Sequence, residues 1–443
     1  MQSRIPLPRL EVAPPRAEEH AGPTDPSHDA RLRRGIIDTD VSRAAAVSIT
    51  VGFLLLIYGI PVSQAVLEKV KGDESILLDV FRHAPTRERL HQFEDDLTQG
   101  SYAKEYTQPL VQEWLTRFGR VGNKRAVVGL GGWLYYKPGI DFVGGPAFLD
   151  EDVVASREKA ALDGGETQIH ADPRPAIFAF HEALAQRSIR LILLPVPDKA
   201  MLQPLELHGR DRGERAMDVA RNADWARFAE DMRAHGVAMF DPAPASLTRG
   251  EAPRYLVQDT HWTPEWMDRV ATELARFVTS TVDLPALDSP PAFSSVAQPV
   301  ERVGDIADML KLPEGQTLFS PQHVTTYRIM GEGGEPWEPD PKGDVLLLGD
   351  SFTNVFSLEE MGWGTAAGLA PHLARALGRG VDVIAQNDSG AFATRQSLAR
   401  AIEAGDDRLA GKKAVIWEFA SRELAVGDWK PIDWKNALAK GGP

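Results

Sequence analysis

Residues 344–354 read DVLLLGDSFTN, and this stretch decides the fold. Four consecutive apolar residues, 345–348, lead directly into Gly349, Asp350 and Ser351. A short and continuously apolar strand is typical of a parallel sheet that is covered on both faces. Glycine permits a tight exit from such a strand, and Ser351 then lies at its carboxyl end, where α/β sheets bind their ligands. Ser351 is therefore a candidate nucleophile if a base reaches it, and otherwise belongs to an ordinary polar turn.

Similar apolar stretches alternate with helical patterns from about residue 173 onward. Further strands are predicted at 191–196, 237–240, 381–385 and 414–419, and helices at 177–186, 217–235, 263–278, 366–377 and 395–403. This alternation predicts an α/β fold, a parallel sheet flanked by helices. Residues 67–120 are predicted to be helical and 125–136 to form two short strands. Residues 284–343 are rich in Pro and Gly and are predicted to be an insertion with one short helix near 303–310.

A second motif, QDTHWTP at 258–264, supplies a candidate base for Ser351. Side chains two residues apart in extended backbone point to the same side, so Asp259 can orient His261. His261 can then take the proton of Ser351, in the manner of a Ser-His-Asp triad. The alternatives for Asp259 and His261 are a structural pair or a helix cap. No metal is predicted, because the two groups have no third ligand beside them.

Composition excludes several classes of protein. The 443 residues include no cysteine, which excludes disulfides, thiol catalysis and zinc–thiolate sites. The formal net charge of −14 argues against sequence-independent binding of nucleic acid. No phosphate-binding loop of the GxxxxGK[ST] type is present, so we expect no cofactor.

The N-terminal segment predicts an extracytoplasmic location for the body of the chain. Residues 1–42 are rich in proline and charge and are predicted to be a disordered cytoplasmic tail, followed by a transmembrane signal-anchor at 43–66. Arginines precede this segment and charges of mixed sign follow it, which places the N-terminus inside. The alternatives are a signal peptide cleaved after the small-x-small site at 63–65 and a buried core helix.

The Gly-Asp-Ser and Asp-x-His motifs together resemble those of the SGNH/GDSL hydrolases. An Asp-x-His-Trp motif that precedes Gly-Asp-Ser-Phe resembles one subgroup, the alginate O-acetyltransferases of the AlgX/AlgJ type. Residues 129–136, 195–200, 304–310 and 415–424 look similar to the same subgroup, and the resemblance covers about 90–425. It implies a circularly permuted, SGNH hydrolase-like (flavodoxin-like) parallel sheet in a domain at 67–430, followed by a C-terminal tail at 431–443.

The resemblance also implies roles for individual residues. Ser351 would be the nucleophile, His261 the base and Asp259 its orienter. Further candidates for the oxyanion hole or for substrate binding are Gly349, Asp350, Trp262, Asn387, Gly390 and Arg422. Other interpretations remain open: a polar turn for Asn387 and Gly390, an ion pair or cap for Asp198 and Arg422, and core packing for Trp262.

The implied activity is transfer of an acetyl group, through a serine ester, to hydroxyls of an exopolysaccharide. The implied partners are the polysaccharide acceptor, a membrane-bound O-acyltransferase (MBOAT) that supplies acetyl groups, and the inner membrane, with the catalytic domain in the periplasm. One alternative is a carbohydrate acetylesterase that uses the same three residues with water as acceptor. Another is a non-catalytic glycan-binding scaffold of an export complex.

Overall fold

The computed structural model describes residues 42–79, 81–82, 84–165, 167–209, 219–243, 252–387 and 390–440. The chain divides into two compact units, residues 1–104 and 105–443. The predicted disordered tail lies outside the described residues, apart from Ser42.

The first unit contains helices α2 (Arg43–Lys71), α3 (Ile76–Asp79) and α4 (Arg87–Gln99). The hydroxyl of Ser42 caps α2 by accepting a hydrogen bond from the backbone N–H of Ala45. By length and composition α2 can cross a membrane, and it continues past the predicted end of the anchor at residue 66.

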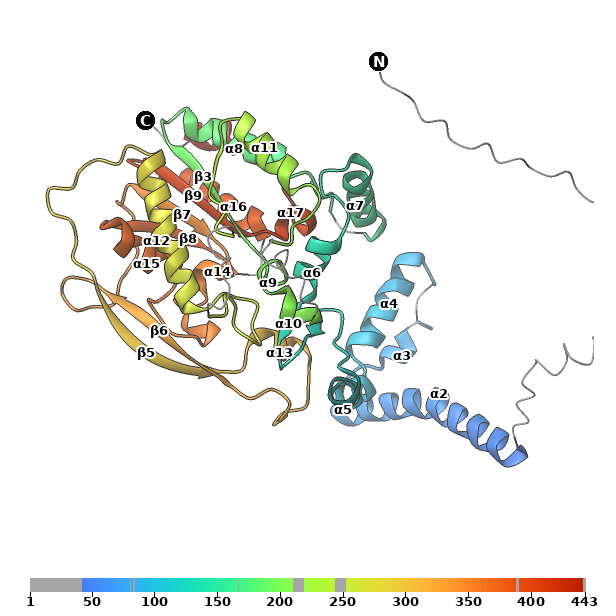
Figure 1. Cartoon of the computed structure of the whole chain (residues 1–443). Helices are drawn as coiled ribbons and strands as arrows, with labels where there is room; N and C mark the ends of the chain where they lie inside the picture. Colours follow the sequence, from blue (N-terminus) through green and yellow to red (C-terminus); the bar gives the residue numbers. More distant parts are fainter. Residues whose placement is uncertain are drawn as a thin grey trace, which may run out of the picture. The chain divides into compact units, whose positions relative to one another are not determined.

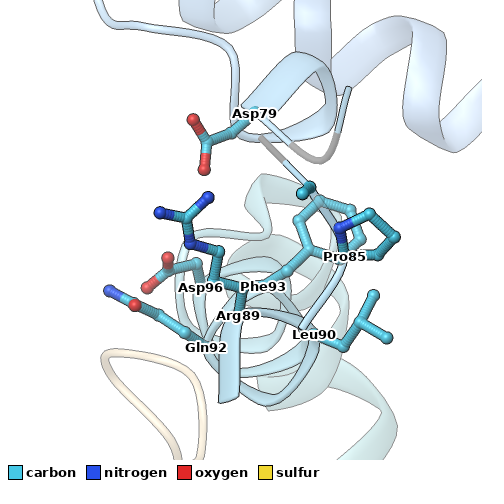
Figure 2. Close-up of a pocket in the computed structure, with 8 residues that line it drawn as sticks. Asp79, Pro85, Arg89, Leu90, Gln92, Phe93 and Asp96 are labelled. Atoms are coloured by element: carbon cyan, nitrogen blue, oxygen red, sulfur yellow. The ribbon is translucent and has the colours of Figure 1, made fainter. Parts of the chain in front are cut away.

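The short helices α3 and α4 enclose a pocket of about 270 Å³ in the same unit. Figure 2 shows the guanidinium of Arg89 between the carboxylates of Asp79 and Asp96. The ring of Phe93 lies beside Pro85. Acidic and basic groups thus face each other across this pocket.

The second unit is built around a five-stranded sheet in the order β4–β3–β9–β7–β8, in which every neighbouring pair is parallel (Figure 1). Its strands are β3 (Arg190–Val196), β4 (Ala238–Met239), β7 (Val345–Gly349), β8 (Val381–Ala385) and β9 (Ala414–Ala420). The predicted parallel α/β fold is confirmed, and the predicted strands lie within about two residues of the observed ones.

Helices cover both faces of this sheet. One face packs against α8 (Arg174–Ala185), α11 (Trp225–Ala234), α16 (Gly390–Glu403) and α18 (Trp434–Lys440), and the other against α12 (Pro264–Thr281) and α15 (Leu369–Leu377). Along β9, Val415 and Trp417 join the first core whereas Ala414 and Ile416 join the second. Because successive side chains enter opposite cores, the strand is apolar at every position except Glu418.

The described chain also contains further, mostly shorter elements outside the sheet. These are α5 (Tyr102–Gly119), which crosses the division between the units, β1 (Ala126–Val128), β2 (Leu134–Tyr136), α6 (Lys137–Gly144), α7 (Glu151–Asp163), α9 (Lys199–Leu202), α10 (Pro204–His208), α14 (Ser351–Asn354), η3 (Glu359–Met361) and α17 (Glu423–Val426). β1 and β2 pair as an antiparallel hairpin, as the sequence predicted for 125–136.

The insertion at 284–343 is more regular than its weak periodicity indicated. β5 (Ser294–Arg302) and β6 (Gln322–Met330) pair along nine residues as an antiparallel two-stranded sheet, and α13 (Asp305–Met309) lies between them in the chain. Most of β5 is exposed, so it lacks the apolar alternation by which a strand is recognised.

The helix predicted at 217–235 begins later than expected, at Trp225. Asn222 explains the difference, because its side-chain amide donates to the carbonyls of Phe142 and Pro146 while its oxygen accepts from the N–H of Asp224. These bonds hold a turn where the sequence predicted a helix. Residues 210–218 lie outside the described part of the chain.

The C-terminal segment predicted as a tail contains helix α18. The ring of Trp434 is buried and stacks on Phe180 of α8 with 4.5 Å between centroids. The packed body therefore includes residues 434–440, beyond the expected boundary at 430.

We predict that Trp434→Ala lowers the free energy of unfolding by about 3–5 kcal/mol, because it removes a buried aromatic ring from the first core. Urea unfolding of the detergent-solubilised full chain measures this change. Lys435→Ala, at an exposed neighbouring position, is the control and should leave the midpoint unchanged. Equal midpoints for the two variants would show that α18 contributes no packing energy.

Candidate active site

The candidate nucleophile lies where strand β7 ends. Ser351 is the first residue of α14, and the carboxylate of Asp350 caps this helix by accepting from the N–H of Phe352. The other oxygen of Asp350 accepts from the N–H of Ala420 at the end of β9. A Cβ at Gly349 would come within 2.1 Å of the hydroxyl of Thr353, so only glycine permits this turn.

The loop that carries the candidate base is held tightly in front of α12. The backbone N–H of Leu256 donates to the carbonyl of His261, and that of Thr263 donates to the carbonyl of Arg254. Thr263 then caps α12 by accepting from the N–H of Trp266, as Thr followed by Pro predicted.

Asp259, His261 and Ser351 form one line of hydrogen bonds. His261 Nδ1 lies 2.6 Å from Asp259 Oδ1, and His261 Nε2 lies 2.8 Å from Ser351 Oγ. Asp259 and His261 are both buried. The structure therefore brings together the three residues that the sequence proposed as a set.

Two residues that the sequence analysis missed hold the far side of Asp259. Its Oδ2 atom accepts from the indole N–H of Trp363 and from the backbone N–H of Asp305, each at 3.0 Å. Asp305 belongs to the stretch 304–310, which the resemblance had marked without assigning it a role. No local signal in the sequence pointed to Trp363.

Electrostatics match these contacts. Burial opposes ionisation of Asp259, but the facing imidazole and the hydrogen bonds outweigh it and hold the pKa of Asp259 well below its usual range. Burial by itself would lower the pKa of His261, yet the charge and hydrogen bond of Asp259 raise it above the usual 6.5. For Asp305, burial and the neighbouring Asp259 raise the pKa to about 6.

An open cleft of about 850 Å³ gives access to this line of residues. Asp259, His261, Asp305, Asp350 and Ser351 all border it. The other lining side chains come from separated segments and include Arg125, Tyr136, Arg302, Met361, Trp363, Arg422, Glu423 and Asp428.

Asn387 and Gly390 also line the cleft, which places two of the weaker candidates beside Ser351. The side-chain oxygen of Asn387 accepts from the amide of Asn354 at 2.9 Å. Gly390 begins α16 with a φ of 59°. Residues 388–389 lie outside the described part of the chain.

Trp262 does not face the cleft. Its ring is fully buried and packs edge-on against Phe352 and Trp266, with centroids 5.2 and 5.9 Å away. The suggestion that Trp262 stacks on a sugar is therefore wrong, and its role is core packing behind His261.

Arg422, which is partly buried, forms an ion pair with the buried Asp198. Arg422 donates to Asp198 Oδ1 from its guanidinium at 2.8 Å and to Oδ2 from its backbone N–H at 2.9 Å. The guanidinium also lies over the ring of Tyr136, 5.0 Å from its centroid. Arg422 thus lines the cleft while the carboxylate of Asp198 neutralises its positive charge.

Glu418 is a buried carboxyl group under the nucleophile turn, and the sequence analysis missed it. Its Oε2 atom accepts from the N–H of Asp350 at 2.9 Å and from the hydroxyl of Thr353 at 2.8 Å. Burial, with the nearby Asp350, raises the pKa of Glu418 well above its usual value. The only sequence signal was an acidic residue inside the otherwise apolar strand β9.

Lys199 supports the loop of Asp259 and His261 from behind. Its ammonium group is buried and donates to the carbonyls of Leu134 at 2.6 Å and Val257 at 3.2 Å. Burial lowers the pKa of Lys199 to about 7, against the opposing effect of Asp259 and Asp305. The side chain thereby fastens the start of the loop to strand β2.

Asp259, His261 and Asp305 are the group of possible metal ligands found in the described ranges, with ligand atoms within 4.8 Å of one another. Both ring nitrogens of His261 already have protein partners at hydrogen-bond distance. We therefore assign these side chains to the hydrogen-bonded line and not to a metal centre.

A parallel sheet with Gly-Asp-Ser at a strand end and a facing Asp–His pair defines an SGNH hydrolase-like domain. The chain belongs to the family described as the SGNH hydrolase-like domain of acetyltransferase AlgX, which it matches over residues 148–421, more than half of its length.

Two curated relatives are both named probable alginate O-acetylase AlgJ. The one from Pseudomonas fluorescens is 26% identical over 279 residues, which is 59% of this chain and 64% of the relative. The one from Azotobacter vinelandii is 24% identical and covers 61% of this chain and 67% of the relative. The match thus spans about two thirds of the length of these relatives.

Similar solved structures include the O-acetyltransferase domain of Pseudomonas putida AlgJ, with a TM-score of 0.49 and 20% identity over 71% of this chain and 97% of that one. Another is Pseudomonas aeruginosa AlgX, with a TM-score of 0.44 and 18% identity over 60% of this chain and 59% of that one.

We predict that Lys199→Met lowers the free energy of unfolding by about 1–3 kcal/mol, because it leaves the buried carbonyl of Leu134 without its donor, whereas that of Val257 keeps the backbone N–H of Leu134. The urea midpoint of the full chain reports the change. Lys413→Met, at an exposed position, is the matched control. An unchanged midpoint for Lys199→Met would mean that this side chain does not fasten the loop.

Proposed function

We propose that this protein is an extracytoplasmic O-acetyltransferase that carries an acetyl group on Ser351 and passes it to hydroxyls of an exopolysaccharide. The observation that carries the proposal is the hydrogen-bonded line from Asp259 through His261 to Ser351, at the edge of an open cleft. Membership of the AlgX acetyltransferase family supports transfer as the outcome.

In the first half of the reaction, Ser351 Oγ attacks the carbonyl carbon of an acetyl ester while His261 Nε2 takes the hydroxyl proton. The resulting oxyanion needs donors that are already in position. The backbone N–H of Ser351 is one candidate donor, and Asn387 at the cleft wall is a second. His261 then gives its proton to the departing alcohol, which leaves an acetyl ester on Ser351.

In the second half, a sugar hydroxyl takes the place of that alcohol. His261 removes its proton as the sugar oxygen attacks the serine ester. The bond from Ser351 Oγ to the acetyl carbon then breaks, and His261 returns the proton to Oγ, so that the acetyl group is on the sugar and Ser351 is regenerated. Asp259 stabilises the imidazolium in both halves and keeps Nε2 directed at Ser351.

The same proposal includes the surroundings of the enzyme. Helix α2 would span the inner membrane once, with the arginine-rich N-terminal segment in the cytoplasm and the catalytic domain in the periplasm. A membrane-bound O-acyltransferase would supply the acetyl group there, and the open cleft suits a polymeric acceptor.

We expect the purified full chain to gain the mass of one acetyl group on incubation with p-nitrophenyl acetate, and Ser351→Ala to gain none. Intact-protein mass spectrometry makes the measurement. Ser295→Ala, at an exposed serine of β5, is the control and should be acetylated like the wild type. Acetylation of Ser351→Ala to the same extent would exclude Ser351 as the nucleophile.

Addition of oligosaccharides to the acetylated protein separates transfer from hydrolysis. The proposal requires loss of the protein adduct together with an acetylated oligosaccharide. Release of acetate alone, with no acetylated acceptor among neutral and uronate oligosaccharides, would identify an esterase.

We also predict the pH dependence of the first half-reaction. Because His261 must be neutral to accept a proton, and Asp259 raises its pKa, the rate of Ser351 acetylation should rise with pH through a pKa above 6.5. Asp259→Asn removes the negative charge that raises the pKa of His261. The pH at which the acetylation rate rises should therefore move down, while the plateau rate falls on the order of 10³–10⁴-fold.

The pH–rate profile of acetylation in each variant is the measurement. A matched control is Asp268→Asn, because Asp268 Oδ1 also lies 2.6 Å from a histidine nitrogen, that of His372, without lining the cleft. Its profile should equal that of the wild type. If the acetylation rate of Asp259→Asn rises at the same pH as that of the wild type, the assignment of His261 as the base is contradicted.

A further inference from the structure

Helix α5 carries its apolar side chains on the outside. Tyr106, Leu110, Trp114 and Phe118 are spaced four residues apart, so they form one stripe along the helix. These four and the adjacent Val111 are between 54% and 69% exposed. We call these five residues the α5 stripe.

The inner side of the same helix is polar. Gln112 and Thr116 are buried, and they are satisfied locally by the carbonyls that follow the helix. Gln112 donates to the carbonyls of Val121 and Gly122, and the hydroxyl of Thr116 also donates to Val121. A surface helix normally buries its apolar side, whereas α5 buries polar residues and exposes apolar ones. This arrangement indicates that an apolar partner outside the described contacts covers the stripe.

The chemistry of the stripe and of its flanks fits a lipid surface. Tryptophan, tyrosine and phenylalanine are favoured at the level of the headgroups, where their rings are partly immersed. Residues 104–125 carry five basic and two acidic side chains, whereas the chain as a whole has a net charge of −14. This locally basic segment would be attracted to anionic headgroups.

The position of α5 in the chain supports the same occupant. The candidate membrane span α2 ends at Lys71, and α5 begins at Tyr102. A chain held in a bilayer by α2 keeps α5 at a high effective concentration near that bilayer, so a modest intrinsic affinity is sufficient for binding.

We propose that the α5 stripe lies in the boundary between headgroups and acyl chains of the membrane that α2 spans. The helix then forms a second, interfacial contact that fixes how the domain is turned toward the bilayer. This inference rests on α2 as the anchor and does not depend on the proposed activity.

The absence of cysteine from the sequence allows a direct test in the full chain. Single-cysteine variants Leu110→Cys and Phe118→Cys are labelled with the fluorophore NBD and reconstituted in 7:3 POPC:POPG vesicles. Val296→Cys on β5, which is 52% exposed and apolar like the stripe residues, is the matched control. Circular dichroism confirms that each labelled variant is folded.

We expect blue-shifted emission at positions 110 and 118, with strong quenching by lipids that carry a nitroxide on the acyl chain, and neither effect at 296. Replacing Arg117 and Arg120 together by Gln should weaken the quenching in POPC:POPG more than in POPC alone. No quenching at 110 and 118, or equal quenching at 296, would overturn the proposal.

Two further outcomes identify another occupant. Energy transfer between labelled copies that persists when the lipid-to-protein ratio is raised tenfold would assign the stripe to a second copy of this chain. Blue-shifted emission that nitroxide lipids do not quench, without energy transfer between copies, would show that another part of the same chain covers the stripe. Either result contradicts the interfacial position.

Discussion

The buried carboxylate of Asp259 is the constraint on which the candidate site depends. It accepts from the backbone and ring of His261, the backbone of Asp305 and the indole of Trp363. A buried charge is tolerated only when its hydrogen-bonding capacity is filled. The carboxylate therefore requires the segments that carry His261, Asp305 and Trp363 to lie next to it. The orientation of His261 toward Ser351 is a result of that arrangement.

Much of the fold and the centre of the site could be predicted because their signals are local. β7 and β9 are apolar at nearly every position since both faces of the sheet are covered, and a run of this kind is visible without any other part of the chain. Asp259 and His261 lie two residues apart, and this spacing was enough to predict the pair. The expected extended backbone is wrong, because residues 257–261 are bent and the N–H of His261 donates to Asp259 Oδ1 at 3.0 Å. The link from His261 to Ser351 was proposed from the chemistry of the three residues, and the resemblance to a family supported it, because 90 residues separate the two and no local pattern joins them.

The remaining parts depend on distant contacts that leave no local pattern. Trp363 reaches Asp259 across 104 residues, and Glu418 reaches the turn of Asp350 across 68. Trp262 was ambiguous because an aromatic residue beside a histidine fits a core as well as a sugar platform. The strands β5 and β6 were missed because they pair mainly with each other. Most of β5 is exposed, so its sequence shows no alternation of apolar and polar residues.

The spread of the Asp259 contacts along the chain has a consequence for biosynthesis. Residues 259, 305, 351 and 363 meet only after the long segments between them have folded, and pairing at such separations forms late. A nascent chain therefore cannot assemble the hydrogen-bonded line from Asp259 to Ser351 until these segments have been made. Under the proposed function, acetylation of Ser351 therefore requires the completed sheet.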